Sequence, residues 1–166
     1  MNWKIPLFDP DLGVEEEQAL VEVIRSKWLT MGDRTASFEN AFADMAGVPV
    51  ALACNSATAA LHMALAALDI GPGAEVVVPS LTFVATANAV RYCGAKPIFA
   101  DVASMSDWNL SAESIDAALT PSTRAIIVVH YAGYPCDMPR IMALAKARNL
   151  AVVEDVAHAP AATLDG

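Results

Sequence analysis

Hydrophobic positions along the chain follow two different periods. Before Gly47, apolar residues recur every three or four positions, which predicts amphipathic helices over residues 14–28 and 35–46. After Gly47, short apolar runs alternate with further helical stretches. The runs predict strands over residues 48–53, 75–79, 96–100, 125–129 and 151–154, and the stretches between them predict helices over residues 57–68, 83–92, 111–119 and 138–149.

This alternation of strands and helices predicts an α/β fold. Successive βαβ units build a mostly parallel sheet with helices on both faces, which gives a three-layer αβα architecture. The runs are nearly continuous in Val, Ile and Ala, as strands buried on both faces should be. We therefore predict an N-terminal helical segment over residues 1–47 and an α/β domain over residues 48–166.

Composition narrows the class of protein. The formal net charge of −9 argues against a nucleic-acid partner, because phosphate backbones require basic surfaces. No apolar run has transmembrane length, and the opening M-N-W-K-I-P-L-F lacks the basic head and apolar core of a signal peptide. The three cysteines are odd in number and widely spaced, which favours reduced thiols. The expectation is a cytoplasmic enzyme with no membrane partner.

The last predicted strand runs into the sequence V-V-E-D-V-A-H-A at residues 152–159. Ligands of α/β proteins bind at the carboxyl ends of the strands, so Asp155 is predicted to meet a charged or hydrogen-bonding group there. A carboxylate is the usual counter-charge for the protonated pyridine nitrogen of pyridoxal phosphate. The alternative is an aspartate that caps a helix or pairs with a surface cation.

A second candidate site is C-N-S-A-T-A-A-L-H at residues 54–62, where a predicted strand leads directly into a helix. Backbone N–H groups at a helix start, together with the hydroxyls of Ser56 and Thr58, suit an anion such as phosphate. Ordinary N-capping by Asn55 or Ser56 is the alternative.

Two further strand ends carry candidates. Phe83, in P-S-L-T-F-V-A-T-A-N-A-V at residues 79–90, either stacks on a flat heteroaromatic cofactor or belongs to the core. His130 and Tyr131 follow another strand and are candidates for the same edge of the sheet. No spacing of histidines, cysteines or carboxylates suggests a zinc or iron site.

Taken together, these motifs resemble one family. From Trp28 to Ala159 the chain is similar to the N-terminal part of the DegT/DnrJ/StrS-type sugar aminotransferases, which are pyridoxal-phosphate enzymes of the aspartate-aminotransferase fold. The matching stretches are W-L-T-M-G-D-R-T-A-S-F-E-N-A-F-A, C-N-S-A-T-A-A-L-H-M-A-L, G-P-G-A-E-V-V-V-P-S-L-T-F-V-A-T-A-N-A-V, G-A-K-P-I-F-A-D-V, V-V-H-Y-A-G-Y-P-C-D-M and V-V-E-D-V-A-H-A. The resemblance implies that residues 48–166 are the first part of the large, cofactor-binding domain of fold-type I enzymes.

The resemblance also implies where the phosphate of the cofactor is held. Ser56, Ala57 and Thr58 occupy the positions that bind it at the start of a helix. Family members more often have glycine where this chain has Ala57. An alanine side chain is still small enough for the backbone to approach the phosphate closely.

The remaining roles concern the ring and the substrate. By resemblance, Asp155 pairs with the pyridine nitrogen, His158 lies near the phenolic oxygen, and Phe83 stacks on the ring. Thr30 and Gly32 lie in a segment that is close to the substrate entrance in such enzymes. The resemblance implies transfer of an amino group from L-glutamate to a keto group of a nucleotide-linked sugar. It also implies that the enzyme is a homodimer.

One family feature is missing from the chain. Family members form a Schiff base with a lysine that follows the Asp/His motif, whereas the lysines here precede it. No catalytic residue of that kind is therefore expected in the chain, and the Schiff-base lysine is expected beyond Gly166. The expectation is a truncated large domain without the rest of that domain or the small C-terminal domain, inactive by itself. The lysines present are Lys4, Lys27, Lys96 and Lys146.

Three alternatives stay open at this point. Some relatives carry histidine in place of the lysine and act as sugar dehydratases. A non-catalytic module would keep the fold without turnover. A flavodoxin-like nucleotide binder would also fit the alternation of strands and helices, but it gives no reason for Phe83, Asp155 and His158 to occur together.

Overall fold

Two units make up the chain in the computed structural model, which describes residues 4–5 and 9–164. The first, here called the helical unit, is Met1–Ala53, and the second, the α/β unit, is Cys54–Gly166. These two units are separated after Ala53, six residues beyond the end of the helical pattern at Gly47. The units describe how the chain packs, and the domain boundary between residues 47 and 48 stays a prediction.

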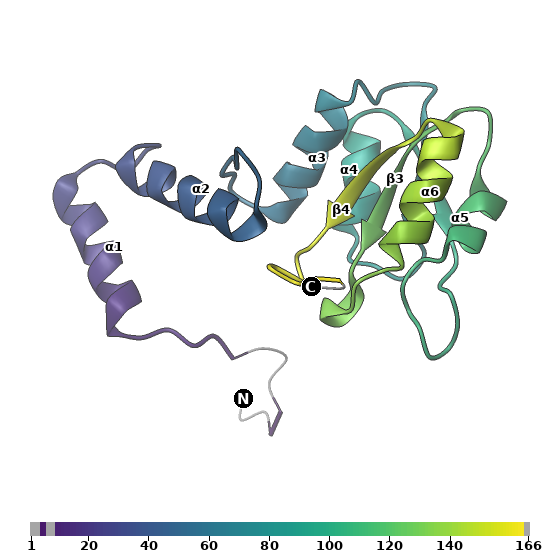
Figure 1. The fold of residues 1–166 in the computed structure, drawn as a ribbon. Helices are drawn as coiled ribbons and strands as arrows, with labels where there is room; N and C mark the ends of the chain where they lie inside the picture. Colours follow the sequence, from purple (N-terminus) through teal and green to yellow (C-terminus); the bar gives the residue numbers. More distant parts are fainter. Residues whose placement is uncertain (1–3, 6–8, 165–166) are drawn as a thin grey trace. The chain divides into compact units, whose positions relative to one another are not determined.

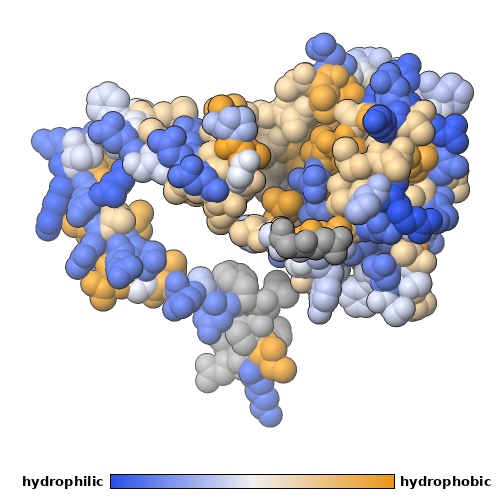
Figure 2. Space-filling model, in the orientation of Figure 1, coloured by the Kyte–Doolittle hydropathy of each residue, from blue (hydrophilic) through white to orange (hydrophobic). Residues whose placement is uncertain are grey.

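The helical unit contains α1 (Val14–Ser26) and α2 (Asp33–Ala46). α1 is shorter than predicted because Lys27 adopts a left-handed backbone, with φ of 61°, and ends the helix. Gly47 ends α2 as predicted, with φ of 65°. No residue of α1 is buried, and Figure 2 shows hydrophobic residues among hydrophilic ones on the surface of this unit.

The α/β unit is built around a parallel sheet in the order β2-β1-β3-β4 (Figure 1). The predicted fold class is thereby confirmed, and the predicted strands 75–79 and 96–100 have the observed bounds. The strands are β1 (Glu75–Pro79), β2 (Lys96–Ala100), β3 (Thr123–Val129) and β4 (Ala151–Asp155). The helices are α3 (Ala57–Ala67), α4 (Ala85–Tyr92), α5 (Ala112–Ala118) and α6 (Met138–Arg148), and a 3-10 turn covers Tyr131–Gly133.

Helices cover both faces of this sheet, as the sequence predicts. On one face, Leu65 of α3 and Val90 of α4 pack with Val76 of β1. On the other, Ile115 of α5 and Ile141 of α6 pack on side chains that alternate with those of the first face. The inner strands β1 and β3 are almost wholly buried, whereas the outer strands β2 and β4 are only partly buried.

One predicted strand is wrong. Residues 48–53 form no strand in the described chain, although their composition is that of a buried strand. A strand requires a neighbour that accepts and donates its backbone hydrogen bonds, and no described strand pairs with this segment. Val50 and Leu52 remain 67% and 72% exposed, so the segment is an irregular connection that leads to α3.

Among the residues that the structure describes, no helix combines the length and apolarity that a membrane span requires.

All three cysteines are free, with Cys54 exposed, Cys93 partly buried and Cys136 buried. Burial raises the pKa of the Cys136 thiol to about 11.

Candidate functional site

The carboxyl ends of β1, β3 and β4 lie at one edge of the sheet, since all pairings are parallel. β3 lies between the other two strands, so residues that follow β1 and β4 face each other across its end. Figure 1 shows that α3 also begins at this edge, where β4 ends. The edge therefore collects the strand-end candidates of the α/β unit.

Asp155 is the last residue of β4 and is half-buried. Its Oδ1 accepts a hydrogen bond from the backbone N–H of Ala157 at 3.1 Å. Its Oδ2 accepts one from the hydroxyl of Thr86, in α4, at 3.4 Å. Both oxygens thus accept from neutral donors, and no cation among the described residues pairs with them, so the carboxylate is held in place and remains available to a ligand.

Phe83 lies in the connection between β1 and α4 and is 73% exposed. It is therefore not part of the core of the α/β unit, which was one of the two alternatives for this residue. The residues that follow it in α4, Ala85 and Thr86, are buried instead. An exposed phenyl ring at the ligand-binding edge of a parallel sheet is suited to covering a flat ligand.

His158 follows β4 and is exposed. Its Nδ1 lies 3.3 Å from the backbone nitrogen of Ala132, and a backbone N–H only donates. Nδ1 is therefore the acceptor, and the proton of the neutral ring is on Nε2, which is left to donate to a ligand. The ring also meets Tyr131 edge-on, with centroids 5.9 Å apart.

The turn that holds His158 is fixed by a buried asparagine. Asn109 is 7% exposed, and its amide donates to the carbonyls of Tyr134 at 3.1 Å and Pro135 at 3.3 Å. Its Oδ1 accepts from the backbone N–H of Tyr131 at 3.0 Å. Three bonds from one side chain thus shape the loop that presents the N–H of Ala132 to His158.

His130 is buried within the same turn, 4% exposed, and both ring nitrogens have partners. Nδ1 accepts from the backbone N–H of Cys136 at 3.1 Å, so Nε2 carries the proton and donates to Glu154 at 2.9 Å. The sequence predicts His130 as a candidate for this edge, and the structure places it there as a support. With both nitrogens bonded, the ring has no free group for a ligand.

At the start of α3, Ser56 is the N-cap, and its hydroxyl accepts from the N–H of Ala59 at 3.2 Å. Capping by Ser56 is thus observed, while Asn55 does not cap the helix. In the described part of the chain, the N–H groups of Ala57 and Thr58 donate to no other protein group. Two unpaired donors at a helix N-terminus suit an anion, so capping and anion binding are compatible at this helix start.

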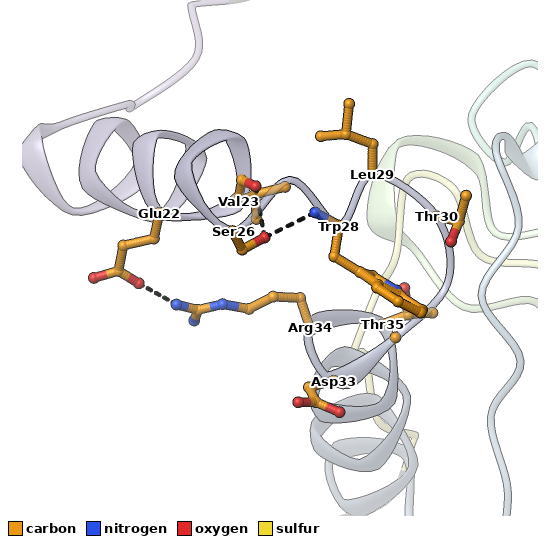
Figure 3. A pocket seen from close by; sticks show the side chains of 10 residues that line it. Glu22, Val23, Ser26, Trp28, Leu29, Thr30, Asp33, Arg34 and Thr35 are labelled. Atoms are coloured by element: carbon orange, nitrogen blue, oxygen red, sulfur yellow. Dashed lines mark hydrogen bonds and ion pairs between the residues drawn. The ribbon is translucent and has the colours of Figure 1, made fainter.

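Thr30 and Gly32 belong to the helical unit, where they line an open cavity of about 680 Å³. Figure 3 shows the ion pair between Glu22 of α1 and Arg34 of α2 at this cavity. A Cβ atom at Gly32 would lie 2.5 Å from Nε1 of the exposed Trp28 indole, so a larger residue would force the indole to shift. The other candidates belong to the α/β unit.

The sequence does not point to Thr86 or Asn109. Thr86 lies within a helical pattern and Asn109 within a polar loop, and neither type of position signals a site. Their partners lie far away along the chain, 69 residues in the case of Thr86 and Asp155. Across residues 4–5 and 9–164, no group of three or more histidines, cysteines or carboxylates is placed to hold a metal ion.

A parallel sheet between two helical layers, with a helix start that leaves backbone N–H donors unpaired and a hydrogen-bonded carboxylate at its carboxyl edge, is typical of a ligand-binding α/β protein. The chain belongs to the DegT/DnrJ/EryC1/StrS aminotransferase family, whose sequence profile matches residues 10–166. GDP-perosamine synthase of Caulobacter vibrioides is 45% identical over 164 residues, which are 98% of this chain and 44% of that protein. The chain thus spans less than half the length of that relative.

Solved structures agree with this assignment. The aminotransferase of Psychrobacter cryohalolentis is 44% identical, with a TM-score of 0.86 over 90% of this chain and 38% of that one. The PLP form of Spr1654 of Streptococcus pneumoniae is 31% identical, with a TM-score of 0.87 over 95% of this chain and 44% of that one. The fold expected from the family resemblance is therefore confirmed.

Proposed function

We propose that the protein is a pyridoxal-phosphate-dependent aminotransferase that acts on a keto group of a nucleotide-linked sugar. The observation that carries this proposal is Asp155, a carboxylate with two neutral donors at the carboxyl end of β4. Support for the substrate class comes from the similarity to GDP-perosamine synthase, and support for the cofactor from the similarity to a structure in PLP form.

The residues present fit the phosphate of this cofactor. The unpaired N–H groups of Ala57 and Thr58 and the hydroxyls of Ser56 and Thr58 are donors at the positive end of α3. An anion at this position would satisfy donors that the described protein leaves free. The alanine at position 57, where the family more often has glycine, is compatible with this role, because the N–H groups of Ala57 and Thr58 remain unpaired in the described protein.

The residues present also fit the ring. Asp155 would pair with the pyridine nitrogen and keep a proton there, because its carboxylate has only neutral donors around it. Phe83 would cover the ring with its exposed face. His158 would donate from Nε2 to the phenolic oxygen, since its Nδ1 already accepts from Ala132. Bound pyridoxal phosphate supplies an electron sink through which an amino group passes between donor and acceptor.

From the family resemblance we further propose L-glutamate as the amino donor, a homodimer as the assembly and the cytoplasm as the location. By the same resemblance, Thr30 and Gly32 are proposed to lie near the substrate. The lysine that binds the cofactor covalently is proposed to lie in the part of the relatives' length that this chain does not span. Residues 48–166 are proposed to be the first part of the cofactor-binding domain.

The test is covalent capture of the cofactor. The protein at its native length is incubated with pyridoxal phosphate, reduced with borohydride and weighed intact. One pyridoxyl adduct per chain is expected for the wild type and for Asp69→Asn, an exposed control at the other end of α3. Asp155→Asn is expected to weaken cofactor binding strongly. Binding without an adduct would favour the dehydratase alternative, and no binding at all would contradict the proposal.

A further inference from the structure

Two threonine hydroxyls lie behind Asp155, on the side of α4. Oγ1 of Thr82 lies 2.8 Å from Oγ1 of Thr86, and Oγ1 of Thr86 lies 3.4 Å from Oδ2 of Asp155. Thr82 is half-buried and Thr86 is fully buried, with no exposed surface. The three side chains form one row that leads from the connection after β1 to the end of β4.

The direction of the hydrogen bonds in this row follows from its last member. An ionised carboxylate only accepts, so the hydroxyl of Thr86 donates to Asp155. Its single proton is then used, and the hydroxyl of Thr82 must donate to the oxygen of Thr86. Each bond polarises the next in the same sense, which places partial positive charge against Oδ2.

Thr86 is the second residue of α4, so no helical turn precedes it to offer a carbonyl to its hydroxyl. The hydroxyl bonds to side chains on both sides instead, those of Thr82 and Asp155. A buried hydroxyl without a partner would cost free energy, so the row satisfies Thr86 and Asp155 together.

We propose that Thr86 is a positioning residue for Asp155 and that Thr82 orients the hydroxyl of Thr86. This rests on the proposed function, in which Asp155 pairs with the pyridine nitrogen of the cofactor. The row holds Oδ2 in one place and stabilises negative charge on it, while the N–H of Ala157 does the same for Oδ1. The carboxylate is thereby aligned to keep the proton on the ring nitrogen.

The test uses the protein at its native length and pyridoxal phosphate labelled with ¹⁵N in the ring. Thr86→Val removes the hydroxyl and keeps the volume, and Thr86→Ser restores it. Thr123→Val is the matched control, because Thr123 is a buried threonine at the amino end of β3, with its hydroxyl bonded to the N–H of Thr120. The readouts are the dissociation constant of the cofactor, the ¹⁵N shift of the ring nitrogen against pH, and the unfolding temperature.

The expected effect is moderate because the contact between Thr86 and Asp155 is long for a hydroxyl donor. Thr86→Val should weaken cofactor binding roughly three- to tenfold and move the ¹⁵N shift towards that of an unprotonated ring. Thr86→Ser should restore both values, and Thr82→Val should give a smaller change in the same direction. Thr123→Val should lower the unfolding temperature and leave both cofactor readouts unchanged.

Each other outcome counts against the proposal. If Thr86→Val or Thr82→Val binds the cofactor with wild-type affinity and an unchanged ¹⁵N shift, the positioning role is wrong while the proposed function stands. If Thr86→Val does not fold, Thr82→Val decides in the same way, because it removes the other hydroxyl of the row. If the wild type binds no pyridoxal phosphate, the proposed function and this inference both fail.

Discussion

The α/β unit and the helical unit differ in what their apolar residues do. In the α/β unit, β1 and β3 bury nearly every side chain between two helical layers, and Ile126 and Ile127 have no exposed surface. In the helical unit, α1 buries no residue and α2 buries only Ala43, while Ile24 and Trp28 are 69% and 61% exposed. Both units carry amphipathic helices. The same sequence pattern thus predicts a helix without predicting what covers its apolar face.

The largest expected difference between the units is in core stability. Ile127→Ala should lower the free energy of unfolding by about 2–5 kcal/mol, because it leaves a cavity in a packed core. Ile24→Ala, on exposed α1, should change it by less than about 0.5 kcal/mol. Urea unfolding of both variants measures this. Equal losses would show that the face of α1 is as well packed as the sheet.

The buried thiol of Cys136 should make the stability of the α/β unit depend on pH. Its pKa is raised to about 11 by burial, so the folded state holds the thiol proton more tightly than the unfolded state does. The resulting stability is fully present below the ordinary thiol pKa and is lost as the pH rises through the folded value. The loss between about pH 9 and pH 11 should be about 2–3 kcal/mol.

Cys136→Ala is the control for this loss. Urea unfolding at pH 8, 9.5 and 11 should show a decline in the wild type that is smaller by about that amount in the variant. A thiol reagent should label exposed Cys54 in the folded protein and Cys136 only after unfolding. Rapid labelling of Cys136 in the folded protein would contradict the burial of its side chain.

In the α/β unit, the turn beside His158 depends on the hydrogen bonds of the buried Asn109. Asn109→Ala removes three hydrogen bonds to the backbone of residues 131–135 and should cost about 1–3 kcal/mol. It should also free the N–H of Ala132 from its position against His158. NMR of the imidazole nitrogens should then show that the preference for a proton on Nε2 is weakened.

Asn40→Ala is the matched control, since Asn40 is an exposed residue of α2. It should change neither stability nor the nitrogen signals of His158. The prediction for Asn109 is contradicted if its variant is as stable as the control and keeps the same imidazole signals.

The smallest expected effect lies in the helical unit. Gly32→Ala should displace the indole of Trp28 and break its hydrogen bond to the carbonyl of Met31, which is 2.9 Å long. The cost should be about 1 kcal/mol because the bond is exposed. A shift in tryptophan fluorescence without a change in the α/β unit is expected. An unchanged spectrum would mean that the indole is not held against Gly32.

Strand positions in the α/β unit could be predicted because burial on both faces leaves an unmistakable apolar run. β1 and β2 have their predicted bounds, and β3 extends the prediction by two residues, at Thr123 and Arg124, whose polar character concealed them. The segment over residues 48–53 has the same composition but no partner strand in the described chain. Pairing is a property of the fold, and composition alone does not report it.

Site residues divide in a similar way. Asp155, His158 and Phe83 follow apolar runs, where a polar or exposed residue at a strand end signals a ligand edge. Thr86 bonds to Asp155, and Asn109 bonds to the loop beside His158, through contacts that only the folded chain brings together. No local pattern identifies them, since a threonine in a helix and an asparagine in a loop are both ordinary.

The most direct test of this account is a crystal structure of the protein at its native length with pyridoxal phosphate bound. The distance that matters joins the pyridine nitrogen to the nearer carboxylate oxygen of Asp155. The account predicts about 2.7–2.9 Å, the length of a charge-assisted hydrogen bond, with the phosphate at the start of α3. A ring nitrogen that meets another group, with Asp155 left facing solvent, would contradict it.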